Sequence, residues 1–332
     1  MKARILVGLM FVLAVALWLP RPEVAVPVED FHVAMGTVVR MALYVNDPEQ
    51  AEPLFAIART EIAAVNAEMS HYAPDSEISR LNRLDIGATM AISPSLRYLL
   101  GRCLEIADRT GGAFDPTIGT LSRLWGFPEA VQPPEAAAID SALGRVGYES
   151  VMLDDGGVAL RRVVQLDLSA VAKGYAVDRA IAALQESGVQ TGVIEAGGDL
   201  RFWGHKPDGR PWRFGVQHPR QPESIVRVAD IGLPALATSG DYEQAFELDG
   251  RRYHHLLDPA TGMPASATVS ASVWTTSALE ADALATAAFI MGPRQALTLA
   301  AATDNVEVLV FYENKEGELK MEMSPGLAGH VE

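Results

Sequence analysis

Asp282 and Thr286 are the residues whose types and spacing most directly suggest chemistry. They stand four positions apart in a segment, 278–291, that otherwise consists mostly of Ala, Leu, Phe, Ile and Met. On a helix, side chains four apart stack on one face, so a carboxylate and a hydroxyl would share a buried edge. Such a pair suits a hard cation such as Mg²⁺, which takes few protein ligands. Alternatively, Asp282 only favours the positive N-terminal end of its helix.

Asp167 and Lys173 form a second candidate group, between an expected strand at 163–167 and an expected helix at about 175–186. The intervening loop, 168–173, would present backbone N–H groups that attract anions, and Lys173 adds a compact positive charge. The segment lacks the GxxxxGK[ST] pattern, so it is not a Walker phosphate loop. The simpler alternative is that Asp167 caps the loop while Lys173 is solvated.

Two further polar blocks are weaker signals. The block 195–199 places Gly197 and Gly198 at a strand end, where a backbone could approach a ligand closely or simply turn. His254 and His255 are adjacent, so on a strand they point to opposite faces and cannot chelate one metal together. Neither HExxH nor GxSxG occurs, which argues against a zinc protease or a serine hydrolase.

The elements that must position these groups alternate between helices and strands. Ser277 and Glu280 predict a capping box at the start of the helix 278–291, and Gly292 predicts its end. The pattern predicts one strand–helix–strand unit ending in a strand at 191–196. Other expected elements are a strand or hairpin over 31–45, helices over 48–70, 95–110 and 294–302, a hairpin over 244–257 turning at Asp249-Gly250, and strands at 268–274, 306–312 and 318–323. With no repeat or linker, this predicts a single α+β domain over 30–332, with mixed sheets and packed helices.

Composition narrows the possible functions. Among 332 residues, 27 Lys and Arg face 42 Asp and Glu, a formal net charge of −15. This acidity opposes binding to nucleic acid phosphates, so no nucleic acid partner is expected. Cys103 is the single cysteine, which excludes an internal disulfide and cysteine-based metal clusters. It lies in an apolar helical stripe and is expected to be a core thiol.

The N-terminus reads as a targeting segment. Lys2 and Arg4 precede the apolar run 5–19, which Pro20 ends. A basic start before such a run is typical of a secretory signal, and the run is shorter than the ~20 residues of a usual spanning helix. Residues 1–29 are therefore predicted to be a signal peptide or an N-terminal membrane anchor. We expect an exported protein on the periplasmic side of the inner membrane, soluble or anchored.

Taken in order, the blocks resemble the FAD:protein FMN transferase family, the ApbE-like flavin transferases. The similar segments span about residues 31–325. They are Met35-Gly-Thr37, YAPDSEISRLN (72–82), GGAFDPTIG (111–119), LWGF (124–127), DLSAVAKGYAVD (167–178), EAGGDL (195–200), ATSGDYEQAF (237–246), YHHLLDPATGMP (253–264) and EADALATAAFIMG (280–292). The resemblance implies a single-domain flavin-transferase fold. It also implies a transferase that cleaves FAD, links FMN to a Thr or Ser hydroxyl of another protein, and releases AMP.

The same resemblance implies roles for individual residues. Asp282, Thr286 and the backbone carbonyl of Ala170 would hold Mg²⁺, and the imidazole of the family's His block falls on His255. From the chemistry alone, either His255 or Asp258 could take the proton of the incoming hydroxyl. The flavin nucleotide would be contacted at Met35, Tyr72, Ala113, Phe114, Asp115, Asp167 and Lys173, with Thr238 and Ser239 as further candidates.

Departures from the family pattern are few, and other functions remain open. The lipobox cysteine of many members is absent, while Glu195 and Ala170 replace a frequent Asn and Gly. A flavin-storage protein, an FAD pyrophosphatase and a non-catalytic maturation factor for a respiratory enzyme are the alternatives. The Asp282/Thr286 pair argues against storage and scaffolding, because neither role needs a phosphate-activating cation.

Overall fold

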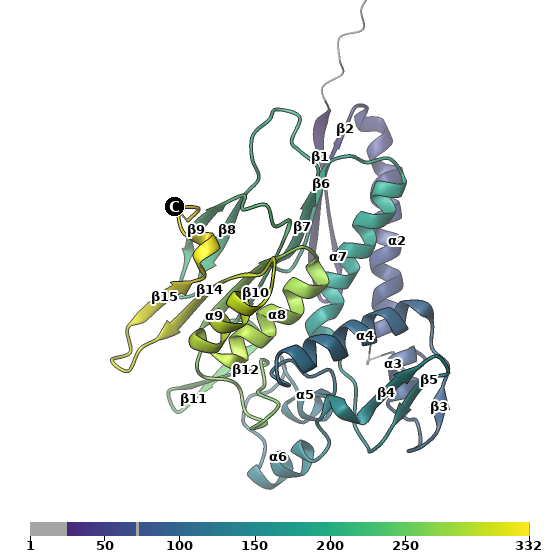
Figure 1. The fold of residues 1–332 in the computed structure, drawn as a ribbon, viewed down its shortest axis with the longest axis vertical. Coiled ribbons are helices and arrows are strands. Elements are labelled where there is room, and N and C mark those ends of the chain that lie inside the picture. Colours follow the sequence, from purple (N-terminus) through teal and green to yellow (C-terminus); the bar gives the residue numbers. More distant parts are fainter. Residues whose placement is uncertain (1–24, 71–72, 332) are drawn as a thin grey trace, which may run out of the picture.

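An eight-stranded antiparallel sheet organises the fold in the computed structural model, which describes residues 25–70 and 73–331 (Figure 1). The strands lie in the order β1-β2-β6-β7-β10-β13-β14-β15. Their bounds are β1 Val26–Ala34, β2 Thr37–Val45, β6 Gly192–Ala196, β7 Asp199–Trp203, β10 Ala235–Gly240, β13 Ser270–Thr275, β14 Glu307–Glu313 and β15 Leu319–Met323. Most of the expected targeting segment, residues 1–24, lies outside the described residues. Tyr72, an expected flavin contact, also lies outside them.

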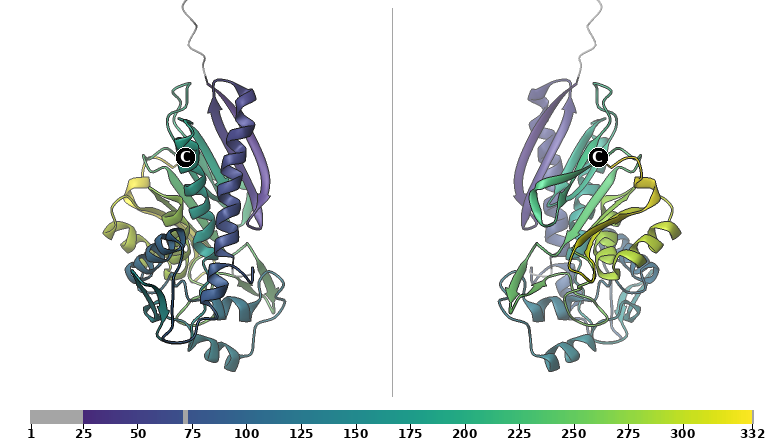
Figure 2. Two further views of the ribbon diagram at one scale, coloured as in Figure 1. Left: turned by 90° about the vertical axis from the view of Figure 1, so that its right-hand side faces the viewer. Right: turned by 90° about the vertical axis from the view of Figure 1, so that its left-hand side faces the viewer.

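Helices cover one face of this sheet. They are α2 Ala51–Met69, α7 Ser169–Glu186, α8 Ala278–Met291 and α9 Pro293–Ala302. Figure 2 shows α2 and α7 in front in one view and the strands in front in the opposite view. Alternation along the strands sends small residues such as Ala235 and Ala237 toward α8 and Leu236 to the other face. The hairpin of β8 (Arg213–His218) and β9 (Gln221–Ala229) covers that other face.

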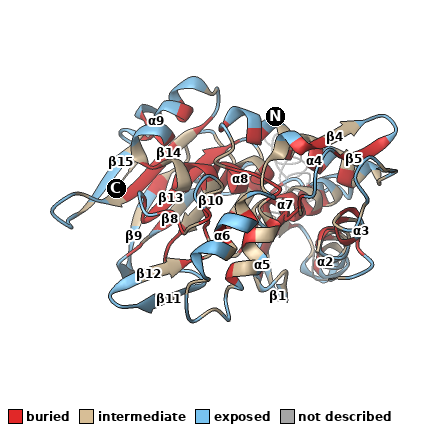
Figure 3. Ribbon diagram, turned by 90° about the horizontal axis from the view of Figure 1, so that it is seen from below, coloured by how far each residue is buried: buried red, intermediate tan, exposed pale blue. Residues whose placement is uncertain are grey.

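Most of the remaining elements pack at one end of the sheet (Figure 1). They are α3 Glu77–Leu81, α4 Pro94–Arg109, α5 Gly119–Trp125, α6 Ala136–Leu143, a small sheet of β3 Thr89–Met90, β4 Val151–Asp154 and β5 Gly157–Leu160, the hairpin β11 Ala245–Leu248 with β12 Arg251–His254, and the 3₁₀ turn 148–150. Two further 3₁₀ turns, 48–50 and 325–327, lie just before α2 and just after β15 in the chain. Seen from below, buried residues concentrate in α7, α8 and the central strands (Figure 3). Among the helices of the described chain, none has the length and apolar character needed to cross a bilayer.

Most elements expected from sequence are confirmed. The helix at 278–291 has the expected bounds, and the hairpin turn at Asp249 and Gly250 has both residues at positive φ, 52° and 75°. Cys103 is fully buried in the core and burial raises the pKa of its thiol, as expected for an inert core cysteine. The mixed helices and sheets form the single α+β domain that the sequence predicted.

The expected strand at 163–167 is wrong. Only Gln165 makes an isolated bridge, to Ile118, because the backbone of this segment is engaged elsewhere. The N–H and C=O of Leu166 bond to the side chain of Asn82 at 2.6 and 2.9 Å. The N–H of Asp167 donates to the carbonyl of Pro116 at 2.9 Å. With these groups used, no ladder forms, and the predicted strand–helix–strand unit is absent.

The expected loop at 168–173 is also wrong, because α7 already begins at Ser169. Lys173 therefore lies in the second turn of a helix. Gly174 is tolerated there because α7 and α8 touch at this point: a Cβ on Gly174 would lie 2.2 Å from the carbonyl oxygen of Ala278. Glycine at position 174 thus allows two helices to approach closely.

Candidate phosphate and cation site

Lys173, Asp199 and Asp282 form the central feature of the site, which we call the lysine–carboxylate cluster. The Lys173 Nζ lies 2.9 Å from Asp199 Oδ2 and 3.4 Å from Asp282 Oδ1. The three residues come from α7, β7 and α8, so the fold brings together groups that are far apart in sequence. Both carboxylates are nearly fully buried, whereas 28% of the Lys173 side chain is exposed. The ion pairs contradict the interpretation of Lys173 as a solvated lysine.

Asp282 is fixed by a second contact to α7. Its Oδ2 accepts a hydrogen bond of 3.1 Å from the backbone N–H of Gly174. The close approach at Gly174 makes this contact possible, since any side chain there would separate the helices. Asp282 therefore does more than favour the N-terminal end of its own helix, because both of its oxygens reach across to the neighbouring one.

The cluster places two carboxyl groups around a single ammonium. Burial, and next the negative charge of Asp282, raise the pKa of Asp199 well above its ordinary value, against the opposing effect of Lys173. Burial alone would lower the pKa of Lys173, but the two carboxylates outweigh it and raise that pKa. Lys173 therefore stays protonated, and one ammonium is shared by two carboxylates.

The turns around Met35 and Gly197 meet beside the cluster. Met35 and Gly36, both at positive φ, form the tight turn between β1 and β2. A Cβ on Gly197 would lie 2.6 Å from Thr37 Oγ1, so only glycine allows the β6–β7 turn to pack against this hairpin. Asp199 directly follows that turn. Glu195, the departure from the family pattern, stabilises the turn by accepting the N–H of Gly198 at 2.7 Å.

Thr286 faces the sheet from α8. Its Oγ1 lies 3.4 Å from the Oγ of Ser239 on β10. Thr238, the neighbouring residue, bonds instead to Ser272 at 2.8 Å and points to the opposite face of the sheet, because side chains alternate along a strand. The structure therefore brings Ser239 to Thr286 but does not bring Thr238 to this side.

His255 is held in one tautomer by the backbone. Its Nδ1 lies 3.2 Å from the carbonyl oxygen of Glu243, and because a carbonyl only accepts, Nδ1 carries the proton and Nε2 is left as an acceptor. Burial lowers the pKa of His255 to about 4, against the effect of the Glu243 carbonyl. The imidazole is thus neutral near pH 7. His254 bonds separately to the carbonyl of Ala265 at 2.9 Å.

Asp258 is occupied within its own loop. One carboxylate oxygen accepts the N–H of Ala260 at 2.9 Å, and the other accepts the hydroxyl of Thr261 at 3.0 Å. Its backbone also closes the turn, since Gly262 N–H donates to its carbonyl at 2.8 Å. The geometry favours His255 over Asp258 as the group that could accept a proton.

Asp115 and Asp167 shape the segments that lead into α7. The carboxylate of Asp115 accepts bonds from the N–H and the hydroxyl of Thr117 at 2.7 and 2.6 Å and from the N–H of Tyr148 at 3.1 Å. Burial raises the pKa of Asp115. Asp167 accepts the N–H of Ser169 at 3.0 Å, so its carboxylate caps the backbone at the start of α7, in line with the simpler alternative. Next to this loop, Phe114 is buried and Ala113 packs partly against the core.

The capping box at α8 forms only in part. Ser277 Oγ accepts the N–H of Glu280 at 3.2 Å, as predicted. The carboxylate of Glu280, however, is directed to Arg109 of α4 and to Thr275. The sequence could not reveal the pairing of Glu280 with Arg109, because the two residues are far apart along the chain.

The donor set fits a hard cation. Asp199 Oδ2 is fully buried and, apart from its ion pair with Lys173, has no hydrogen-bond partner among the described residues. Asp282 and Thr286 supply a carboxylate and a hydroxyl one helical turn apart, and Ala170 lies one turn before Gly174 on the facing helix. Within the described residues, no group of three His, Cys, Asp or Glu side chains could hold a metal, so protein ligands to Mg²⁺ would include backbone or hydroxyl oxygens.

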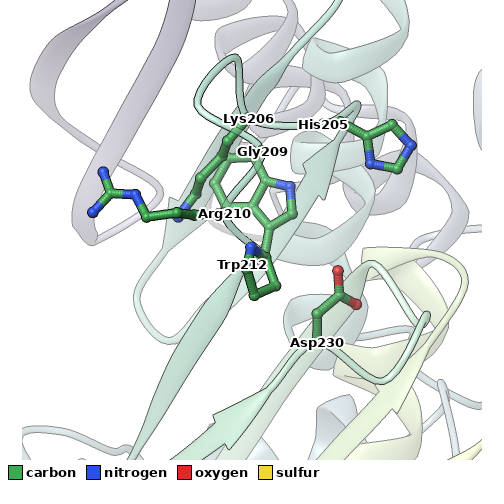
Figure 4. A pocket seen from close by; sticks show the side chains of 7 residues that line it. His205, Lys206, Gly209, Arg210, Trp212 and Asp230 are labelled. Atoms are coloured by element: carbon green, nitrogen blue, oxygen red, sulfur yellow. The ribbon is translucent and has the colours of Figure 1, made fainter.

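A cavity of about 330 Å³ lies elsewhere, beside the loop between β7 and β8 (Figure 4). It is lined by His205, Lys206, Gly209, Arg210, Pro211, Trp212 and Asp230. The sequence analysis singled out none of these residues. Lys206 lies over the Trp212 ring at 4.6 Å, and Arg210 pairs with Asp208 at 2.6 Å. Its cations are thus satisfied by groups close to them in sequence, whereas the cluster joins charges from three separate elements.

Sequence reasoning missed Asp199 as a member of the site. The residue stood inside the Gly-Gly block, but nothing in its spacing linked it to Lys173. The carbonyl of Glu243, which orients His255, was missed because backbone acceptors leave no sequence signal. Asp178, at the end of the Lys173 block, has contacts with α8 that only the fold reveals.

The fold and the cluster together define an α+β protein with a buried, net acidic ionic centre between two helices, a kind of centre that suits a cation and bound phosphates. The chain belongs to the ApbE family, whose sequence model matches residues 35–310. It is 33% identical to the FAD:protein FMN transferase of Vibrio cholerae serotype O1 over 305 residues, covering 88% of this chain and 90% of that relative.

Solved structures agree with this assignment. The ApbE protein of Thermotoga maritima superposes with a TM-score of 0.83 at 32% identity, covering 92% of this chain and 99% of that one. The apo form of the flavinyl transferase ApbE of Pseudomonas stutzeri gives a TM-score of 0.82 at 30% identity, covering 92% and 97%. The family fold expected from sequence is thereby confirmed.

Proposed function

We propose that this chain is a Mg²⁺-dependent FAD:protein FMN transferase. It transfers FMN from FAD to a Thr or Ser hydroxyl of an acceptor flavoprotein and releases AMP. Family membership supports the reaction class, since relatives at 33% identity carry this name. The observation that carries the proposal is the pairing of Lys173 with Asp282 across α7 and α8. The proposal assigns the ammonium of this pair to phosphate and the carboxylate to the cation.

The reaction is a phosphoryl-type transfer with no redox change. The acceptor hydroxyl oxygen forms a bond to the phosphorus of the FMN half of FAD, and the bond from that phosphorus to the bridging oxygen breaks. AMP leaves with the bridging oxygen and its electron pair. The hydroxyl proton goes to Nε2 of His255, which the Glu243 carbonyl keeps in the accepting tautomer.

Charge stabilisation is the main task of the remaining groups. Lys173 remains protonated and would bind the pyrophosphate oxygens, with its exposed part reaching the substrate. Asp282, Thr286 and the Ala170 carbonyl would hold Mg²⁺. When bound, this ion would neutralise charge on the pyrophosphate and orient it. Positioning and electrostatics of this kind supply most of the catalysis in phosphoryl transfer.

The acceptor and the enzyme are proposed to meet outside the cytoplasm. The support is the basic and then apolar N-terminus, Lys2 to Leu19, which has the form of an export signal. We therefore propose a periplasmic location on the inner membrane or beside it, and an exported or membrane flavoprotein subunit as acceptor.

Transfer is tested by incubating the purified protein with FAD, Mg²⁺ and candidate exported flavoproteins, then reading covalent flavin fluorescence on a denaturing gel. The proposal predicts a fluorescent acceptor band that depends on Mg²⁺, together with AMP. Release of free FMN and AMP without a labelled acceptor, across the candidate set, would instead identify an FAD pyrophosphatase. Intact FAD in every sample would indicate storage or scaffolding.

A further inference from the structure

Asp178, on α7, is bound to the first turn of α8. Its Oδ1 accepts the backbone N–H of Ala278 at 3.0 Å, and its Oδ2 accepts that of Leu279 at 2.9 Å. The first N–H groups of a helix have no partner within the helix. Here, two of them are satisfied by a carboxylate from a different helix, and the next, of Glu280, is satisfied by Ser277.

Arg201 holds the Asp178 carboxylate in place. Its Nη1 donates to Asp178 Oδ1 at 2.7 Å from β7, the strand that also carries Asp199. The Asp178 side chain is 16% exposed and that of Arg201 is 27% exposed. A partly buried carboxylate with three donors is strongly oriented, because charge-assisted hydrogen bonds are stronger than neutral ones. Strand β7, α7 and the start of α8 are thus joined at one carboxylate.

The contacts of Asp178 mirror those of Asp282. Asp178 of α7 accepts N–H groups of α8, and Asp282 of α8 accepts the N–H of Gly174 on α7. Asp178 is four residues after Gly174, and Asp282 is four residues after Ala278. The two contacts are therefore one helical turn apart on both helices, which run antiparallel. Each contact fixes the same axial register.

This register controls the proposed metal ligands. A shift of α8 along α7 would move Asp282 away from Lys173 and the N–H of Gly174. In a regular helix, that N–H bonds to the carbonyl four residues earlier, which is Ala170. Because the N–H of Gly174 also donates to Asp282, its hydrogen bond to the Ala170 carbonyl should be weaker than in a regular helix. This is the carbonyl that the family resemblance assigns to the cation.

We propose that Asp178 is a positioning residue for the reaction: by capping α8 from α7, it keeps Asp282, Thr286 and the Ala170 carbonyl in the arrangement that binds Mg²⁺. This inference rests on the proposed function for the role of the ion. It assigns no contact between Asp178 and the substrate. Asp178 acts through α8.

The test compares Asp178→Asn with Ser277→Ala. Both remove part of the cap at the same helix end, but only Asp178 connects that end to α7. Mg²⁺ binding is measured by calorimetry with Mg²⁺ alone, and the Mg²⁺ concentration for half-maximal FMN transfer is measured beside it. Asp178→Asn should weaken Mg²⁺ binding at least ~10-fold, as expected for a group that orients metal ligands. The kcat at saturating Mg²⁺ should be restored, and Ser277→Ala should bind Mg²⁺ like the wild type while losing thermal stability.

Arg201→Gln keeps the proposal testable if Asp178→Asn does not fold. It keeps the Asp178 carboxylate that caps α8 but removes the donor from β7 that holds it, so it should weaken Mg²⁺ binding by a smaller factor than Asp178→Asn. Asp178→Asn and Arg201→Gln proteins that bind Mg²⁺ as tightly as Ser277→Ala would overturn the positioning role. A wild type that binds Mg²⁺ without transferring FMN would overturn the proposed function, while the calorimetric comparison would still decide the role of Asp178.

Discussion

The lysine–carboxylate cluster and the cavity beside Trp212 contain similar residue types but differ in how their charges are balanced. In the cluster, Lys173 is shared by Asp199 and Asp282, all from different elements, and both carboxylates are buried. Beside Trp212, the cations come from one loop, and Arg210 is paired with Asp208, two residues away. Buried, unbalanced charge requires a partner, whereas exposed and locally paired charge does not. The difference explains why the cluster, rather than the cavity, is the proposed site.

Asp282→Asn should have the largest effect. It keeps the shape of the side chain but removes the charge, so FMN transfer should fall by on the order of 10²–10³, the usual loss for a preorganised electrostatic group. The matched control is Glu280→Gln on the same helix, whose carboxylate pairs with Arg109. The control should lose stability but retain transfer, as measured by covalent flavin fluorescence and melting temperature. If the two variants transferred FMN equally well, the charge of Asp282 would not be needed for transfer.

His255→Gln should reduce kcat by roughly 10²-fold or more, because a positioned general base contributes about that much. Asp258→Asn should affect kcat less, since both Asp258 oxygens hold their own loop. The measurement is kcat at saturating FAD, Mg²⁺ and acceptor, after circular dichroism has shown that both variants are folded. A greater kcat loss in Asp258→Asn would reassign the base to Asp258.

Lys173→Gln should destabilise the ligand-free protein, because Asp199 and Asp282 would lose their shared cation. We expect a loss of about 2 kcal/mol, less than for a fully buried pair because Lys173 is partly exposed. Mg²⁺ should restore part of this stability by supplying positive charge. The comparison is Lys206→Gln, beside Trp212, which should change stability by less than about 0.5 kcal/mol, with or without Mg²⁺. The measurement is the free energy of unfolding of both variants in urea, with and without Mg²⁺. Equal losses of stability and equal responses to Mg²⁺ would contradict the difference between the two regions.

A smaller effect is expected in the pH dependence of stability. Burial lowers the pKa of His255 in the folded protein to about 4, whereas an unfolded histidine has a pKa of about 6.5. Between these values the unfolded state binds more protons, so stability contributed by the neutral imidazole is lost as the pH falls. The free energy of unfolding of the wild type should therefore decline more steeply than that of His255→Gln from pH 6.5 to 4. Parallel curves would contradict a lowered pKa for His255 in the folded protein.

The sequence predicted the elements with strong periodicity and clear ends. The helix at 278–291 and the hairpin turning at Asp249 and Gly250 could be predicted because apolar spacing, capping and turn residues all agree there. The segment 163–167 failed because its apolar residues are typical of a strand, while its backbone groups are bonded to Asn82 and Pro116. Local patterns carry no information about such distant partners.

From the sequence, the candidate site could be predicted only where a single helix contributes two of its functional side chains. Asp282 and Thr286 share a helix face, so their spacing indicated a site. Asp199 and Asp178 were missed because their partners are set by the sheet order and by the register between α7 and α8. Gly174 shows the same limit: its role in letting the two helices touch depends on a partner about a hundred residues away.

We propose that the contact between α7 and α8 forms the cation centre at which FAD is bound and cleaved. The most direct test is an anomalous diffraction experiment on crystals grown with Mn²⁺ in place of Mg²⁺ and with FAD, since Mn²⁺ accepts similar oxygen ligands. We expect an anomalous peak bound by Asp282, Thr286 and the Ala170 carbonyl, with the FAD pyrophosphate at Lys173. A peak away from Asp282, with the pyrophosphate elsewhere, would contradict it.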